Sequence, residues 1–111
     1  MNTKPVKLID KSRTLVATAQ VTDEGPQYGG TIVLDSTPPA LRAVFDEFEE
    51  IVNDQAFSFL DEIQAKIGAF GIRALFDDGF ELEVKDLQAF PSTGDVSFKL
   101  VGSPAHAVKS A

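Results

Sequence analysis

Cysteine is absent from the 111 residues, and histidine occurs once, as His106. The lack of thiols excludes disulfide bonds, thiol catalysis and zinc–thiolate sites, and it fits a reducing compartment. His106 lies in a terminal segment without hydrophobic periodicity, where a solvated side chain is favoured over a general base. The body of the chain therefore lacks the usual nucleophiles and bases, which favours a binding protein over an enzyme.

Long apolar runs are also missing. Residues 1–13 hold no apolar stretch of the length found in signal peptides, and no other stretch reaches the roughly 20 residues that cross a bilayer. We therefore expect a cytoplasmic protein that does not bind membranes. Hydrophobic residues make up 43% of the chain and charged residues 24%, as in ordinary globular proteins. This composition predicts a single domain over residues 14–101, with a basic segment at 1–13 and a mobile tail at 102–111.

Positive charge is scarce outside the first 13 residues. That segment has four basic residues and one acid, whereas residues 14–111 have six basic residues and 16 acids, within a total net charge of −7. An acidic body repels the phosphates of nucleic acids and of anionic membranes, so neither is expected as a partner. The excess charge favours solubility, and it suits a basic protein as partner.

No motif indicates a cofactor or a metal ion. The stretch "YGGT" at 28–31 lacks the lysine and the glycine spacing of a phosphate-binding loop. The acidic stretch "DDGFELE" at 77–83 does not match an EF-hand loop. Its glutamates alternate with core residues, as expected on the solvent-exposed face of a strand. The stretch "DEFEE" at 46–50 covers the outer side of a helix. We therefore expect no catalytic residues, no cofactor and no metal ion.

Alternating hydrophobic residues predict strands on both sides of a central helix. Residues 14–23 and 31–35 form a hairpin around a glycine-rich turn, and residues 72–90 form a second hairpin that turns at Asp78-Gly79. The alternation slips at Lys85-Asp86, which indicates a bulge, and a last strand follows at 96–100. The piece Val6 to Ile9 either extends the first strand or forms a separate edge segment.

Between the two groups of strands, residues 39–70 predict one long amphipathic helix. Prolines suit its first turn, and Gly68 and Gly71 mark its end. Its apolar residues repeat every 11 positions, so the stripe stays on one face of a straight helix. The stripe consists of Leu41, Phe45, Phe48, Val52, Ala56, Phe59, Ile63, Ile67 and Phe70. Phe48 and Phe59 are therefore expected to anchor the core.

These elements predict an α+β fold. It is an antiparallel sheet of about five strands in the order β-β-α-β-β-β, with the long helix packed on one face. The helix would be about 48 Å long, whereas a domain of this size is roughly 35 Å across. Either the helix breaks at Asn53-Asp54, where two poor helix formers adjoin, or its excess length packs against another subunit. The unbroken stripe favours the second alternative and predicts a homo-oligomer, with a dimer as the first choice.

Phe57 is the candidate interaction residue. On a helix it lies roughly 200° from Phe59, so the two rings cannot both face one core. Glu50, Asp54 and Asp61 share the side of Phe57. An aromatic ring among carboxylates suits a partner that offers apolar surface bordered by Lys or Arg, or a second subunit. The alternatives are an isolated exposed residue and a local break in the helix that swings Phe57 inward.

Two functions of different classes are consistent with this sequence. The first is a small acidic protein-interaction or assembly module, without catalytic activity, that acts as a homo-oligomer. The second is a small-molecule-binding domain or enzyme with a pocket between helix and sheet that uses Asp and Glu chemistry. The missing nucleophiles and bases favour the first.

Overall fold

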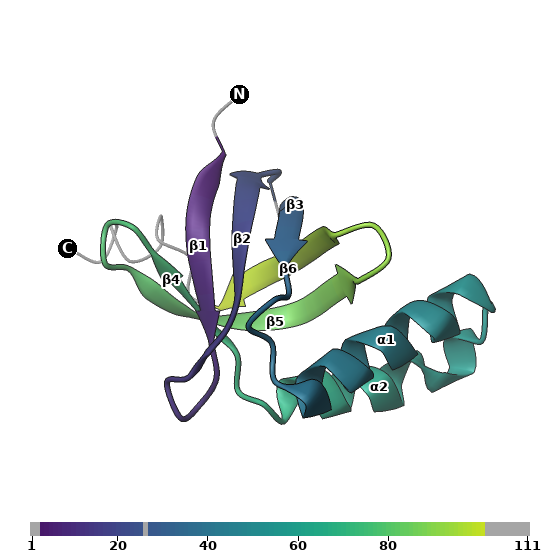
Figure 1. The fold of residues 1–111 in the computed structure, drawn as a ribbon. Coiled ribbons are helices and arrows are strands. Elements are labelled where there is room, and N and C mark those ends of the chain that lie inside the picture. Colours follow the sequence, from purple (N-terminus) through teal and green to yellow (C-terminus); the bar gives the residue numbers. More distant parts are fainter. Residues whose placement is uncertain (1–2, 26, 102–111) are drawn as a thin grey trace.

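The computed structural model describes residues 3–25 and 27–101, which form a closed six-stranded antiparallel barrel with a helical hairpin packed beside it (Figure 1). Around the barrel the strand order is β1-β2-β3-β6-β5-β4, and β4 pairs back to β1. The elements are β1 (Lys4–Ile9), β2 (Leu15–Asp23), β3 (Tyr28–Val33), α1 (Pro39–Asn53), the 3-10 turn η1 (Phe57–Phe59), α2 (Leu60–Gly68), β4 (Arg73–Phe76), β5 (Glu81–Phe90) and β6 (Asp95–Val101). The tail predicted as mobile, at 102–111, lies outside the described residues.

The predicted α+β sheet with one long helix is therefore wrong. The sixth strand comes from β1, which is a separate strand and not an extension of β2. Val6 in β1 pairs with Ala19 in β2 on one side and with Phe76 in β4 on the other. Because β1 joins the two halves of the chain, the sheet has no open edge there and closes into a barrel.

Both predicted hairpins are confirmed, but the first turn is shorter than predicted, because β3 begins at Tyr28 and Gly29 and Gly30 lie in the strand. The two predicted hairpins are present as β2–β3 and β4–β5, and Gly79 has the positive φ of 92° expected in the second turn. In the pairing of β5 with β6 the register shifts between Lys85 and Gln88, as the slip in alternation indicated. Asp86, at this bulge, has a φ of 52°, and short Asp side chains tolerate that left-handed conformation better than most residues.

The continuous helix predicted over residues 39–70 is also wrong, because α1 ends at Asn53. The amide of Gln55 donates to the carbonyl of Val52 at 3.1 Å, and the amide of Ala56 donates to the carbonyl of Ile51 at 3.0 Å. These two bonds are those of a Schellman motif, which ends a helix with one residue in the left-handed conformation. Here that residue is Gln55, with a φ of 56°. Glycine usually occupies this position, so Gln55 itself gave no signal for the break. The two poor helix formers Asn53 and Asp54 did, and the alternative of a break at this pair is the one that the structure shows.

After the break the chain reverses, and α1 and α2 pack against each other and against β5. Figure 1 shows that the connection between the two helices points away from the barrel. We refer to this connection, with the adjoining turns of both helices, as the tip (residues 47–63). No helix in the part of the chain that the structure describes is both long and apolar enough to cross a membrane.

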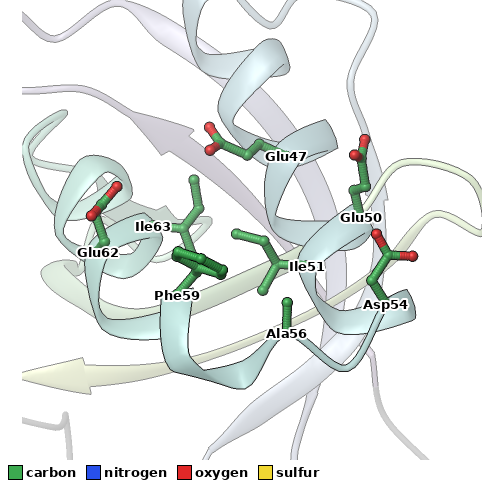
Figure 2. A pocket seen from close by; sticks show the side chains of 8 residues that line it. All are labelled: Glu47, Glu50, Ile51, Asp54, Ala56, Phe59, Glu62 and Ile63. Atoms are coloured by element: carbon green, nitrogen blue, oxygen red, sulfur yellow. The ribbon is translucent and has the colours of Figure 1, made fainter.

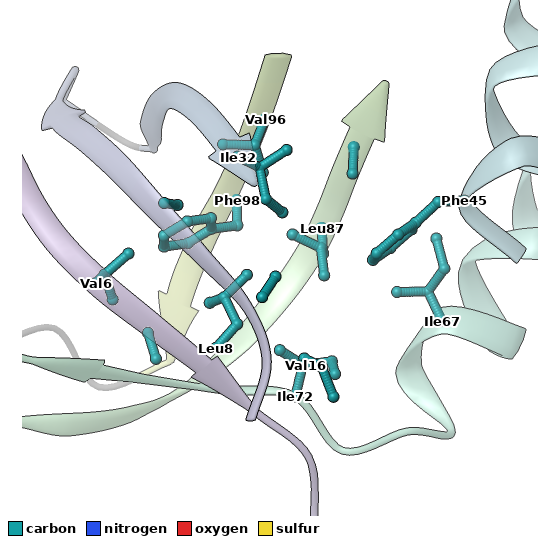
Figure 3. Close-up of a cluster of buried hydrophobic side chains, with 14 of the residues drawn as sticks. Val6, Leu8, Val16, Ile32, Phe45, Ile67, Ile72, Leu87, Val96 and Phe98 are labelled. Carbon is teal, nitrogen blue, oxygen red and sulfur yellow. The ribbon is translucent and has the colours of Figure 1, made fainter. Parts of the chain in front are cut away.

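The core continues from the barrel into the hairpin. Phe45 and Phe48 of α1 and Ile63 and Ile67 of α2 are all buried. Figure 3 shows Leu87 of β5 between the barrel interior and the side chains of Phe45 and Ile67. One hydrophobic cluster therefore holds the hairpin to the barrel.

Of the two predicted core anchors, one is confirmed and one is wrong. Phe48 is 1% exposed and packs edge-on against Phe90, with ring centroids 5.4 Å apart. Phe59 is 55% exposed, because the break after Asn53 places it in η1 rather than on the buried face of a helix.

Glu81 links three segments around the barrel. Its carboxylate accepts hydrogen bonds from both terminal nitrogens of Arg13 at 2.9 Å and from Nε of Arg73 at 2.7 Å. Arg13 lies in the β1–β2 turn, and Arg73 is in β4. The guanidinium of Arg13, followed by that of Arg73, lowers the pKa of the Glu81 carboxyl from 4.5 to about 2.

We expect Glu81→Gln to destabilise the protein at neutral pH and to have little effect in strong acid. Since the pKa of Glu81 is lower in the folded protein, its carboxylate stabilises the fold above about pH 4.5 and loses this contribution as the pH falls toward about 2. Urea unfolding at a series of pH values gives the free energy of unfolding of wild type and variant. The difference between the two free energies should shrink as the pH falls from about 4.5 to about 2. Glu83→Gln, an exposed position on the same strand, is the control. If this difference in free energy did not change with pH, the stabilising role of the ionised Glu81 carboxylate would be contradicted.

Candidate functional site

The tip carries a groove between α1 and α2. Its volume is about 390 Å³. Figure 2 shows the side chains that line it, which are Glu47, Glu50, Ile51, Asp54, Ala56, Phe59, Glu62 and Ile63. Two kinds of side chain are present: apolar ones that form the floor, and carboxylates that form the rim.

The floor is built by the same motif that ends α1. The hydrogen bond from the Ala56 amide to the Ile51 carbonyl brings these two residues together, as Schellman motifs commonly do with apolar side chains. Phe59 and Ile63, from η1 and α2, complete the floor, and Figure 2 shows them facing Ile51 across the groove. Phe59 keeps more than half of its surface in solvent, so a partner can still bury it.

The rim is acidic on both helices. Glu47 and Glu50 are in α1, Asp54 is the C-cap residue of the same helix, and Glu62 comes from the first turn of α2. Lys66 is near one of them, with its Nζ 3.4 Å from a carboxylate oxygen of Glu47. The other three carboxylates form no ion pair among residues 3–25 and 27–101. The groove therefore presents negative charge around an apolar floor.

The structure brings together only two of the four predicted site residues. Glu50 and Asp54 line the groove. Phe57 is 56% exposed in η1 but does not line the groove. Asp61 faces a different cleft, between the hairpin and the sheet.

Sequence reasoning missed Phe59 as a site residue, because the 11-residue repeat assigned it to the core. One feature of the sequence indicates that Phe59 is exposed. Asn53 and Asp54 are poor helix formers, and a helix break at this pair removes Phe59 from the buried stripe. Phe57 and Phe59 then become the two exposed rings of one short turn.

The chemical groups of the groove are carboxylates and apolar side chains. Its lining contains no histidine, cysteine, serine or lysine within the part of the chain that the structure describes. Within the same residues, no group of three or more His, Cys, Asp or Glu side chains is arranged to hold a metal ion. What the groove offers is apolar contact together with charge attraction.

Comparison of the chain with models of protein families, with curated proteins and with solved structures gives no match. The fold and the groove are therefore the basis for any functional assignment.

Proposed function

We propose that this protein is a non-catalytic interaction module whose tip groove binds a cationic and partly apolar segment of another protein. The observation that carries this proposal is the exposed Phe59 on an apolar floor that four carboxylates surround. The absence of cysteine supports the cytoplasm as its compartment.

The groove has the features of an interaction site. Aromatic residues are enriched at the centres of interfaces, where burial of a large ring supplies much of the binding energy. Acidic residues at the rim attract a partner of opposite charge and disfavour partners of like charge. Because the rim carboxylates are exposed, this attraction weakens as the salt concentration rises.

A second copy of this chain is the competing occupant of the groove. The homo-oligomer was predicted from the length of one continuous helix, and that argument no longer holds because the helix is broken. A symmetric contact through the tip would bring two sets of rim carboxylates together, which is unfavourable. Phe57 and Phe59 still offer apolar surface for it. The two occupants differ in their response to salt, since screening weakens binding of a cationic partner and strengthens a dimer of acidic tips.

We expect a synthetic amphipathic peptide, with leucines and arginines at helical spacing, to bind the groove. Phe59→Ser should weaken this binding by at least about fivefold, equivalent to the roughly 1 kcal/mol that marks a contributing interface residue. Phe57→Ser should weaken it less, because Phe57 does not line the groove. Fluorescence anisotropy of the labelled peptide measures both effects, and Phe80→Ser, an exposed ring at the β4–β5 turn, is the control.

Two charge reversals distinguish binding of the peptide in the groove from its attraction to the acidic protein as a whole. Glu50→Lys and Asp77→Lys change the net charge equally, but only Glu50 lines the groove. We expect Glu50→Lys to weaken peptide binding much more than Asp77→Lys. Equal effects, or equal binding of a peptide with glutamate in place of arginine, would overturn the proposal. So would sedimentation that shows a dimer strengthened by salt and lost in Phe59→Ser, because the second copy would then be the occupant.

A further inference from the structure

A second concave site lies between the hairpin and the sheet. It is a cleft of about 390 Å³, which is within the range of small-molecule sites. Its lining comes from α1, α2, β5, β6 and the β2–β3 loop. The residues are Gln27, Phe48, Val52, Leu60, Asp61, Gln64, Asp86, Gln88, Phe90 and Lys99.

One part of the cleft is apolar. Val52 and Leu60 are half-buried side chains of the two helices, and Phe90 of β5 is half-buried on the opposite wall. The rings of Phe48 and Phe90 meet at an interplanar angle of 64°. Because Phe48 is fully buried, Phe90 is the ring that a ligand in the cleft can reach.

Three amides line the same cleft. Gln27, Gln64 and Gln88 are each half-buried, and none of their side chains forms a hydrogen bond with another group among the described residues. Each amide presents both a donor and an acceptor. A ligand with polar groups would therefore find hydrogen-bonding groups that are not paired within residues 3–25 and 27–101.

The charges of the cleft leave one carboxylate without a cation. Lys99 lies 3.6 Å from Asp86, whose position is set by the bulge in β5. Asp61, in the first turn of α2, has no ion-pair partner among residues 3–25 and 27–101. The cleft consequently favours a ligand with a single positive charge and disfavours an anion.

From these contacts we propose that the cleft binds a small organic monocation that carries an aromatic ring, of the arylalkylamine class. The ring packs against Phe90, Val52 and Leu60, and the ammonium group is attracted to Asp61. The N–H groups of the ammonium donate hydrogen bonds to amide oxygens of the glutamines. This site is separate from the tip groove in its lining residues, so it stands independently of the proposed interaction with a cationic protein segment.

The test is a titration of the ¹⁵N-labelled protein with 2-phenylethylamine, followed by NMR. We expect saturable shifts of the backbone signals of Gln64, Gln88 and Lys99. The matched probe 3-phenylpropionate has the same ring and a carboxylate in place of the ammonium group, and we expect it to cause no saturable shifts. Equal binding of both probes would overturn the proposal, because the charge of the cleft would then be irrelevant.

Two substitutions of Asp to Asn assign the bound amine to a site. Asp61→Asn is expected to weaken binding of 2-phenylethylamine by at least fivefold, whereas Asp54→Asn, in the tip groove, is expected to leave it unchanged. Phe90→Leu should also weaken it, since it removes the ring and keeps an apolar side chain. Shifts confined to Ile51 and Phe59, or an effect of Asp54→Asn alone, would place the amine in the tip groove and refute the cleft as its site. The peptide experiment above is unaffected by either result.

Discussion

Replacement of Phe48 by alanine is expected to lower the free energy of unfolding by about 3 to 5 kcal/mol, the usual range for a buried phenylalanine. Phe48 is 1% exposed and lies where α1 meets β5. Its removal would leave a cavity beside Phe90 and weaken the attachment of the hairpin to the barrel. Urea denaturation measured by circular dichroism gives this free energy.

Phe59→Ala is the matched control for Phe48→Ala. It removes the same atoms from the same hairpin, but the ring of Phe59 is 55% exposed. We therefore expect it to cost less than about 1 kcal/mol, well below the cost of a truncation in the core. Similar losses for the two variants would mean that Phe59 is a core residue and that the tip groove is not an open site.

Gly30→Ala is expected to destabilise the barrel by about 3 kcal/mol, the upper end of the cost of overpacking. Gly30 in β3 pairs with Val21 in β2. A Cβ atom at this position would lie 1.9 Å from the carbonyl oxygen of Gln20. Because that neighbour is backbone, the two strands would have to separate locally, and the β2–β3 hydrogen bonds would weaken.

Gly68→Ala is the control for Gly30→Ala. Gly68 is the last residue of α2, and a Cβ atom there would meet nothing within 4 Å. Alanine is a better helix former than glycine, so this change is expected to stabilise the protein by about 0.5 kcal/mol. If Gly30→Ala were as well tolerated as Gly68→Ala in urea denaturation, the close approach of β2 and β3 would be contradicted.

Local features of the fold could be predicted from the sequence because each depends on a few neighbouring residues. Gly79 supplies the positive φ of the β4–β5 turn, and the slip in alternation at Lys85-Asp86 marks the bulge. The start of α1 was also readable, since prolines suit the first turn of a helix. These features require no knowledge of what packs against them.

The end of α1 could not be predicted in the same way. The apolar spacing continues through Asn53 and Asp54 without a change of phase, and Gln55 is not a residue that usually ends a helix. The break is compatible with burial because each half of the stripe packs separately, Phe45 and Phe48 from α1 and Ile63 and Ile67 from α2. A periodic pattern identifies a buried face but not whether one helix or two supply it.

The candidate site was predicted in part. Glu50 and Asp54 were identified with Phe57 as an acidic and aromatic surface, and the structure places both carboxylates at the groove. Phe59, the ring that lines the groove, was assigned to the core for the same reason that the break was missed. Asp61 was grouped with this surface by its helical angle, but the reversal of the chain turns it toward the cleft beside β5.

The sequence by itself determined the two hairpins, the last strand, the bulge and the acidic character of the chain, because these follow from the identities and spacing of adjacent residues. Only the tertiary structure decided that β1 pairs with both β2 and β4 and so closes a barrel. Those pairings join segments far apart in the chain, and their stability comes from a shared core that no single segment encodes. The groove and the cleft have the same origin, since both exist only where α1 and α2 fold back on each other and pack against β5.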